Sequence, residues 1–158
     1  MDIERLIYDV NGAALAVHEH LPPGFLESVY KKALLHELEL RGIHAVEEQG
    51  INIYYKGHCV GNYKADIFVE NRLILELKSV SHISVDHELQ LVNYLTATGI
   101  DTGILYNFGS QMLEIKRKYR LHKDEWGSQD ISQTAATMLY GDPSIIRRLP
   151  DAPLDCNF

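Results

Sequence analysis

The sequence has no apolar run approaching the roughly 20 residues needed to cross a bilayer. It opens Met-Asp-Ile-Glu-Arg, which is acidic and has no basic region, so a secretory signal is not expected. The two cysteines, Cys59 and Cys156, lie far apart and show no metal-ligand spacing. We therefore predict free thiols in a reducing compartment and a cytoplasmic protein without a membrane partner.

Positive charge is also scarce, because 15 Lys and Arg face 22 Asp and Glu, a net charge of −7. This balance argues against a general nucleic-acid coat, whose affinity comes from many phosphate contacts. It does not argue against a nuclease, because such a site carries its own carboxylates and a bound metal offsets them. The basic residues that are present gather in one segment: Lys116, Arg117, Lys118, Arg120 and Lys123.

A length of 158 residues with 46% hydrophobic content suits one globular domain with a full core. Hydrophobic periodicity predicts an α/β protein in which helices and strands mix. The expected helices cover about 2–20, 25–41 and 85–98, and the expected strands about 43–55, 58–69, 73–80, 102–108 and 112–119. We predict a domain over 1–120. Residues 121–158, with a possible helix at 129–140, are predicted to be a C-terminal extension that packs on the core or on a partner.

The centre of the pattern is a predicted hairpin, in which the polar triplet 70–72 separates two apolar runs. With that loop, Asp66 falls opposite Glu76, and opposed Cβ atoms lie about 5 Å apart. Lys78 shares their face because side chains alternate along a strand. The apolar neighbours should point the other way: Ala65, Ile67, Val69, Leu73, Leu75 and Leu77.

Two carboxylates at this spacing repel each other unless positive charge lies between them. A hard divalent cation such as Mg²⁺ or Mn²⁺ takes such oxygen ligands. A lysine beside it can activate water or stabilise charge on a phosphate. A purely structural role is the alternative interpretation. In it, Asp66 and Lys78 are solvated charges at the rim of the sheet, and Glu76 and Lys78 form an ordinary ion pair on one face of the strand.

Other candidates lie on the predicted helices. Glu27 and Tyr30 are three residues apart, and Gln90 and Tyr94 four apart, so each pair shares a helix face. His18 lies near the end of the first helix. Structural roles also fit: a first-turn acid, a core-edge aromatic, a surface glutamine beside an aromatic, and a packing histidine.

These motifs together resemble a known family. Gly24-Phe25-Leu26-Glu27-Ser28-Val29-Tyr30 matches the signature of the GxxExxY protein family. Asp66 followed by Glu76-Leu77-Lys78 resembles the D…(D/E)xK core of the PD-(D/E)xK nuclease superfamily. The chain resembles the small GxxExxY branch of that superfamily over roughly residues 3–120. The leading proline of the motif is Ala65 here, a replacement that is frequent in the superfamily.

The resemblance implies a restriction-endonuclease-like core, a mixed sheet flanked by helices in αβββαβ order, with an extra N-terminal helix. It implies that Asp66, Glu76 and the Leu77 carbonyl hold Mg²⁺ or Mn²⁺. It also implies that Lys78 orients or activates the attacking water. Glu27 would reach in from the second helix, either to bind a second metal or to hold Lys78 and a metal-bound water.

Further residues match elements of RecB-like nucleases. Gln90 and Tyr94 resemble the QxxxY element, which lies beside the metal centre and the scissile phosphate. His18 corresponds to an upstream histidine that ligates metal in some of these enzymes.

The leading hypothesis is a metal-dependent nuclease that acts on DNA, with RNA left open as a substrate. The alternative is a non-catalytic binding or assembly module on the same fold. A third hypothesis is a nuclease subunit that works with a protein partner or as a homo-oligomer, in which Lys116, Arg117 and Lys118 guide the nucleic acid.

Overall fold

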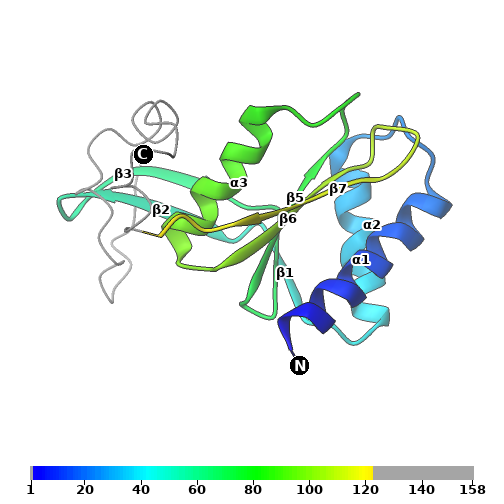
Figure 1. The fold of residues 1–158 in the computed structure, drawn as a ribbon, viewed down its shortest axis with the longest axis horizontal. Coiled ribbons are helices and arrows are strands. Elements are labelled where there is room, and N and C mark those ends of the chain that lie inside the picture. The colour runs from blue at the N-terminus through cyan, green and yellow to red at the C-terminus, as the bar shows by residue number, and fades with distance from the viewer. Residues whose placement is uncertain (1, 123–158) are drawn as a thin grey trace.

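The structure is a computed structural model that describes residues 2–122 (Figure 1). The predicted helix at 129–140, and the predicted packing of 121–158 beyond residue 122, lie outside the described residues.

A five-stranded mixed sheet forms the centre of the fold, in the order β1-β4-β5-β6-β7. Only β5 and β6 run parallel, because α3 connects them, and the other neighbours are antiparallel. β2 and β3 form a separate two-stranded sheet. The elements in chain order are α1 (Ile3–His20), α2 (Glu27–Leu40), β1 (Ala45–Glu47), β2 (Gly50–Tyr55), β3 (His58–Lys64), β4 (Ile67–Val69), β5 (Leu73–Lys78), α3 (Val85–Thr98), β6 (Thr102–Asn107) and β7 (Glu114–Tyr119).

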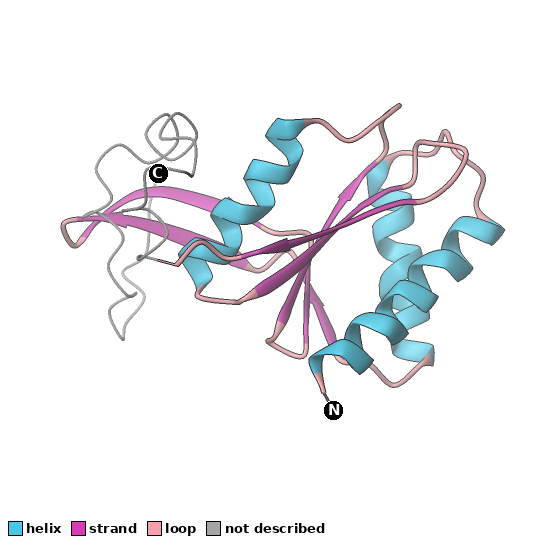
Figure 2. Ribbon diagram, viewed as in Figure 1, coloured by secondary structure: helices cyan, strands magenta, loops and turns pink. Residues whose placement is uncertain are grey.

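Helices flank the sheet on both faces, as Figure 2 shows. On one face, Leu73, Leu75 and Leu77 of β5 pack in one core with the apolar side of α1 and α2. On the other face, Ile74 packs against Leu91 of α3 in a second core. Because side chains alternate along β5, Glu76 and Lys78 lie on the α3 side. This is the mixed α/β, restriction-endonuclease-like arrangement that the resemblance predicts.

The central hairpin has the predicted register. Val69 pairs with Leu73, and Ile67 with Leu75. Glu70 and Asn71 take left-handed backbone angles, with φ of 50° and 52°, in the three-residue loop 70–72 that joins the strands. Asp66 and Glu76 are the next opposed positions beyond this register.

One predicted strand is divided in two. The segment 58–69 was expected to be continuous, but β3 ends at Lys64 and β4 begins at Ile67. The chain leaves its pairing with β2 there and joins the central sheet. Consequently Ala65 packs in the core on the α3 side, not with Ile67 and the other apolar neighbours as the alternation predicted. The segment 43–55 is likewise divided, into β1 and β2.

The helix ends agree with the sequence. Ser84 begins α3 with a capping box to His87, and Gly99 ends it with a left-handed φ of 74°.

The expectation of free thiols was wrong at Cys59, which is disulfide-bonded. Among residues 2–122, no helix is both long and apolar enough to span a membrane.

Candidate active site

The β4–β5 hairpin positions two carboxylates. Asp66 lies directly before β4, and its Oδ2 accepts a hydrogen bond of 2.8 Å from the backbone N–H of Leu77. This bond fixes the Asp66 carboxylate against β5. Glu76, on β5, is only 3% exposed. The backbone of the hairpin therefore brings both acids to the same end of the sheet.

Lys78 connects this pair to α3. Its Nζ donates to Glu76 Oε1 at 3.2 Å and to Gln90 Oε1 at 3.1 Å. Gln90 in turn donates through Nε2 to the hydroxyl of Tyr94 at 2.8 Å. The four side chains form one continuous line of hydrogen bonds from the strand to the helix, which holds the lysine in a single place.

Glu76 is the most perturbed acid of the site. Burial, followed by the charge of Asp66, raises its pKa to about 7, although Lys78 acts in the opposite direction. Its Oε2 is buried and has no hydrogen-bond partner among the described residues. A buried carboxylate oxygen without a partner is unfavourable, and a cation would satisfy it. The donor chemistry of this pair therefore fits a hard divalent ion.

Glu27, the first residue of α2, belongs to the same electrostatic group. Burial raises its pKa, the charge of Asp66 raises it further, and Lys78 and Lys31 act against the rise. Tyr94 responds similarly, since burial and the charges of Glu76 and Asp66 raise the pKa of its phenol. The structure thus gathers Glu27, Tyr94 and the hairpin acids.

Lys31 is a site residue that sequence reasoning missed. It lies one helical turn after Glu27, and its side chain is only 12% exposed. Its Nζ lies 2.8 Å from Glu48 Oε1 and 3.7 Å from Asp66 Oδ1. The spacing of four residues from Glu27 was the available signal, because it places both side chains on one face of the helix.

Tyr30 shapes the turn that leads into α2. Its hydroxyl donates to the carbonyl of Pro22 at 2.6 Å and accepts from the N–H of Phe25 at 3.2 Å. Its ring stacks on Phe108 with centroids 4.8 Å apart. Gly24 within the turn has φ of 118°, which other residues rarely adopt. Tyr30 therefore supports the turn directly before Glu27.

His18 lies elsewhere. Its Nε2 is 3.2 Å from the carbonyl oxygen of Ser110, in the loop between β6 and β7. Within the described part of the chain, no hydrogen bond, ion pair or ring contact joins it to Asp66 or Glu76. Residues 2–122 contain no group of three or more His, Cys, Asp or Glu placed to hold a metal ion. The oxygen donors at this end of the hairpin are the carboxylates of Asp66 and Glu76. Metal roles for the Leu77 carbonyl and for His18 stay predictions.

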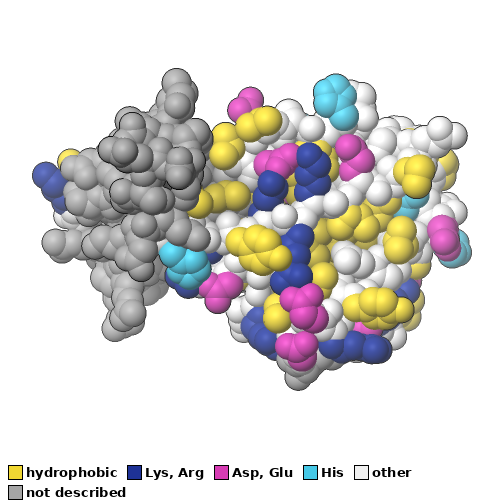
Figure 3. Space-filling model, in the orientation of Figure 1, with side chains coloured by type: hydrophobic (Ala, Val, Ile, Leu, Met, Phe, Trp, Pro, Cys, Tyr) yellow, Lys and Arg dark blue, Asp and Glu magenta, His cyan; other side chains and the backbone are white. Residues whose placement is uncertain are grey.

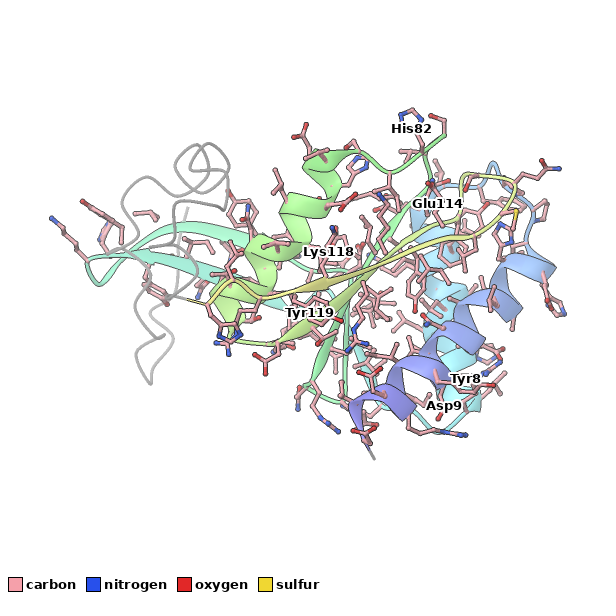
Figure 4. All side chains as sticks on the ribbon, viewed as in Figure 1. Tyr8, Asp9, His82, Glu114, Lys118 and Tyr119 are labelled. Carbon is pink, nitrogen blue, oxygen red and sulfur yellow. The ribbon has the colours of Figure 1, made fainter. Side chains whose placement is uncertain are left out.

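The basic segment is paired with acids. Lys116 and Lys118 both contact Glu88 of α3. On the opposite side of β7, Arg117 binds Glu4 of α1 at 2.7 Å. Lys118 and Glu114 are labelled in Figure 4, and Figure 3 shows acidic and basic side chains mixed on this face. A role in nucleic-acid binding for these basic residues stays a prediction.

Comparisons with known proteins agree with this geometry. The sequence model of the PD-(D/E)XK nuclease superfamily matches residues 4–118. No curated protein matches the chain. Among solved structures, the crystal structure of SSO0001 is similar with a TM-score of 0.50 and 18% sequence identity. The similarity covers 61% of this chain and 52% of SSO0001, so this chain matches about half of that protein's length. At this identity the likeness concerns the fold.

Proposed function

Since the chain belongs to the PD-(D/E)XK nuclease superfamily, we propose that it is a Mg²⁺- or Mn²⁺-dependent nuclease that hydrolyses DNA phosphodiester bonds. We also propose that it belongs to the GxxExxY branch, and the positions of Gly24, Glu27 and Tyr30 in the turn and beside the hairpin acids support this proposal.

The observation that carries the proposal is the buried Glu76 Oε2, which has no partner among the described residues although it lies beside a second acid. Asp66, Glu76 and the carbonyl of Leu77 are the groups that would hold the ion. A divalent ion bound there would lower the pKa of water and offset charge on the phosphate. Two carboxylates with several retained waters is a common way for proteins to bind Mg²⁺.

Lys78 is the group that would orient the attacking water and stabilise charge on the phosphate, and its hydrogen bonds to Glu76 and Gln90 support this role. The Oε1 of Gln90 accepts a hydrogen bond from the Lys78 ammonium, and the hydroxyl of Tyr94 accepts one from Gln90. Glu27 adds a carboxylate from α2, and burial and the charge of Asp66 raise its pKa above the usual value.

The test separates metal binding from chemistry. Linear duplex, single-stranded, flap and RNA substrates are incubated with Mg²⁺ or Mn²⁺ and wild type, Lys78→Ala or the exposed-lysine control Lys32→Ala. Metal binding is measured separately as a rise in melting temperature. We expect cleavage by wild type and Lys32→Ala but not by Lys78→Ala, and metal-dependent stabilisation that is lost in Asp66→Ala.

Cleavage that survives Lys78→Ala would contradict the assigned chemistry. Metal binding without cleavage of any substrate would instead favour the non-catalytic or partner-dependent module on this fold.

A further inference from the structure

A two-stranded sheet lies beside the site but outside the central sheet. Figure 1 shows β2 and β3 projecting away from the body of the molecule. β2 contacts α3, the helix that carries Gln90 and Tyr94. β3 ends at Lys64, two residues before Asp66. The projecting sheet is therefore joined to the site both through the chain and through α3.

Tyr63, near the end of β3, lies next to the line of site residues. Its side chain is 53% exposed, and its ring centroid lies 6.0 Å from that of Tyr94, with the planes tilted by 47°. Tyr94 accepts from Gln90, which accepts from Lys78. Two hydrogen bonds and one ring contact thus separate an exposed aromatic surface from the Lys78 ammonium.

The ring of Tyr63 is held in place. A Cβ atom added at Gly61 would lie 3.2 Å from Tyr63 Cε2, so the ring lies close over the Gly61 backbone. The backbone of Tyr63 pairs with Ile51 of β2. A ring fixed by a strand, a glycine and a second ring loses little freedom when a ligand stacks on it.

We propose that Tyr63 stacks on an unpaired base next to the scissile phosphate, so that the preferred substrate is single-stranded. This inference rests on the proposed nuclease function. Bases within a duplex already stack on both neighbours, whereas an unpaired base offers a free face to an aromatic side chain.

The charges around Asp66 suit this substrate. Lys31 and Lys64 both approach Glu48, at 2.8 Å and 3.9 Å, and Lys78 lies on β5. Three ammonium groups close to the acids provide contacts for the phosphates that flank one stacked base. These ammonium groups are few and each lies near an acid, so the site offers only a few phosphate contacts, as a short single strand requires.

The experiment measures binding of an end-labelled single-stranded DNA oligonucleotide by fluorescence anisotropy in EDTA, where cleavage cannot interfere. Tyr63→Leu removes the ring and keeps apolar bulk, and Tyr63→Phe keeps the ring. Tyr8→Leu is the matched control, because Tyr8 is 71% exposed on α1 (labelled in Figure 4). We expect about tenfold weaker binding for Tyr63→Leu, the size of one base stack, and wild-type affinity for Tyr63→Phe and Tyr8→Leu.

A set of oligonucleotides with one abasic position each makes the test specific. One of them should bind wild type about tenfold more weakly, with no further loss in Tyr63→Leu because the stack is already absent. Equal affinities of wild type and Tyr63→Leu, or a preference for blunt duplex, would overturn the inference.

The two proposals fail in different ways. Cleavage that does not depend on Tyr63 would support the proposed nuclease function and contradict the proposed stacking role of Tyr63. Binding that depends on Tyr63 and on one base, in a protein that cleaves nothing, would support the stacking site and contradict the nuclease. Absence of binding to every oligonucleotide would overturn the stacking site.

Discussion

Glu76 carries an energetic cost in the folded protein. Its pKa is raised from 4.5 to about 7, first by burial and then by the charge of Asp66. Between these values the folded chain binds a proton that the unfolded chain has lost. The free energy of unfolding therefore falls as pH rises through this range. Above about pH 7 the ionised group stays buried, and its cost is then fully present unless a cation offsets it.

Glu76→Gln should remove this cost. In EDTA above about pH 7 we expect the variant to be more stable than wild type by up to about 3 kcal/mol, the equivalent of the pKa difference. Near pH 4 the two proteins should be about equally stable, because Glu76 is then protonated in both states. Urea unfolding at several pH values measures this. A difference that does not change with pH would show that burial of the charge is not its source.

Lys31 offsets the charge of Asp66 in the metal-free protein, at 3.7 Å. Lys31→Met keeps the length of the side chain and removes the ammonium. We expect Mn²⁺ to bind about tenfold more tightly, because the acids then attract the ion without competition. Calorimetric titration measures the affinity, with the exposed Lys32→Met as the control. Unchanged Mn²⁺ affinity in Lys31→Met would mean that the Lys31 ammonium of the wild type interacts with Glu48 and does not offset the charge of Asp66.

The sequence predicts the residues of the hairpin better than those around it. Once the loop is placed at residues 70–72, the pairing of the two strands follows, and it sets Asp66 opposite Glu76 on the same face. Glu48 was not predicted, since it has φ of 52° between β1 and β2, an unusual angle for a residue with a side chain. Without Glu48 the partner of Lys31 could not be identified.

At the scale of elements, the turn before α2 decides where Glu27 lies. The Tyr30 hydroxyl satisfies a carbonyl and an N–H in this turn. Ser79, directly after β5, donates to the carbonyl of Phe25 at 2.8 Å. The turn is thus attached both to its own helix and to the strand that carries Lys78.

Tyr30→Phe should loosen the turn. Loss of the hydroxyl leaves the two backbone groups without this partner, and we expect destabilisation of about 1–2 kcal/mol. Chemical unfolding measures it, with the exposed Tyr8→Phe as a control that should change little. We also expect faster hydrogen exchange at the N–H of Phe25. A stability equal to wild type would show that water replaces the hydroxyl at no cost.

The strand boundaries show what alternation omits. The apolar pattern of 58–69 predicts extended chain, and the chain is extended on both sides of Ala65. The pattern does not say which partner each half pairs with, and β3 and β4 belong to different sheets. Helix ends were predictable because caps such as Ser84 and Gly99 act within a few residues.

At the scale of the molecule, charge limits how nucleic acid is held. The net charge is −7, and the basic residues of β7 are paired with Glu88 and Glu4. With about three ammonium groups at the site, the affinity for single-stranded DNA should fall with salt with a log–log slope of about −2. Titrations at several salt concentrations measure the slope. A slope of about −5 or steeper would indicate an extended basic surface instead.

The order of helices and strands was predictable because turn signals separate them, except that the predicted strands 43–55 and 58–69 are each divided in two. Their association across the sheet was not derivable from the residues alone. It followed from the resemblance, since the apolar pattern within a strand does not say which strand lies beside it.

Two contacts have a consequence for synthesis on the ribosome. The hydroxyl of Tyr106 on β6 donates to Asn11 of α1, 95 residues earlier, and Arg117 on β7 binds Glu4, 113 residues earlier. The first helix therefore leaves the exit tunnel long before the strands that cover it. Until the strands of the central sheet emerge, the apolar side of α1 has only α2 to pack against, and apolar surface exposed in this way is the kind that chaperones bind.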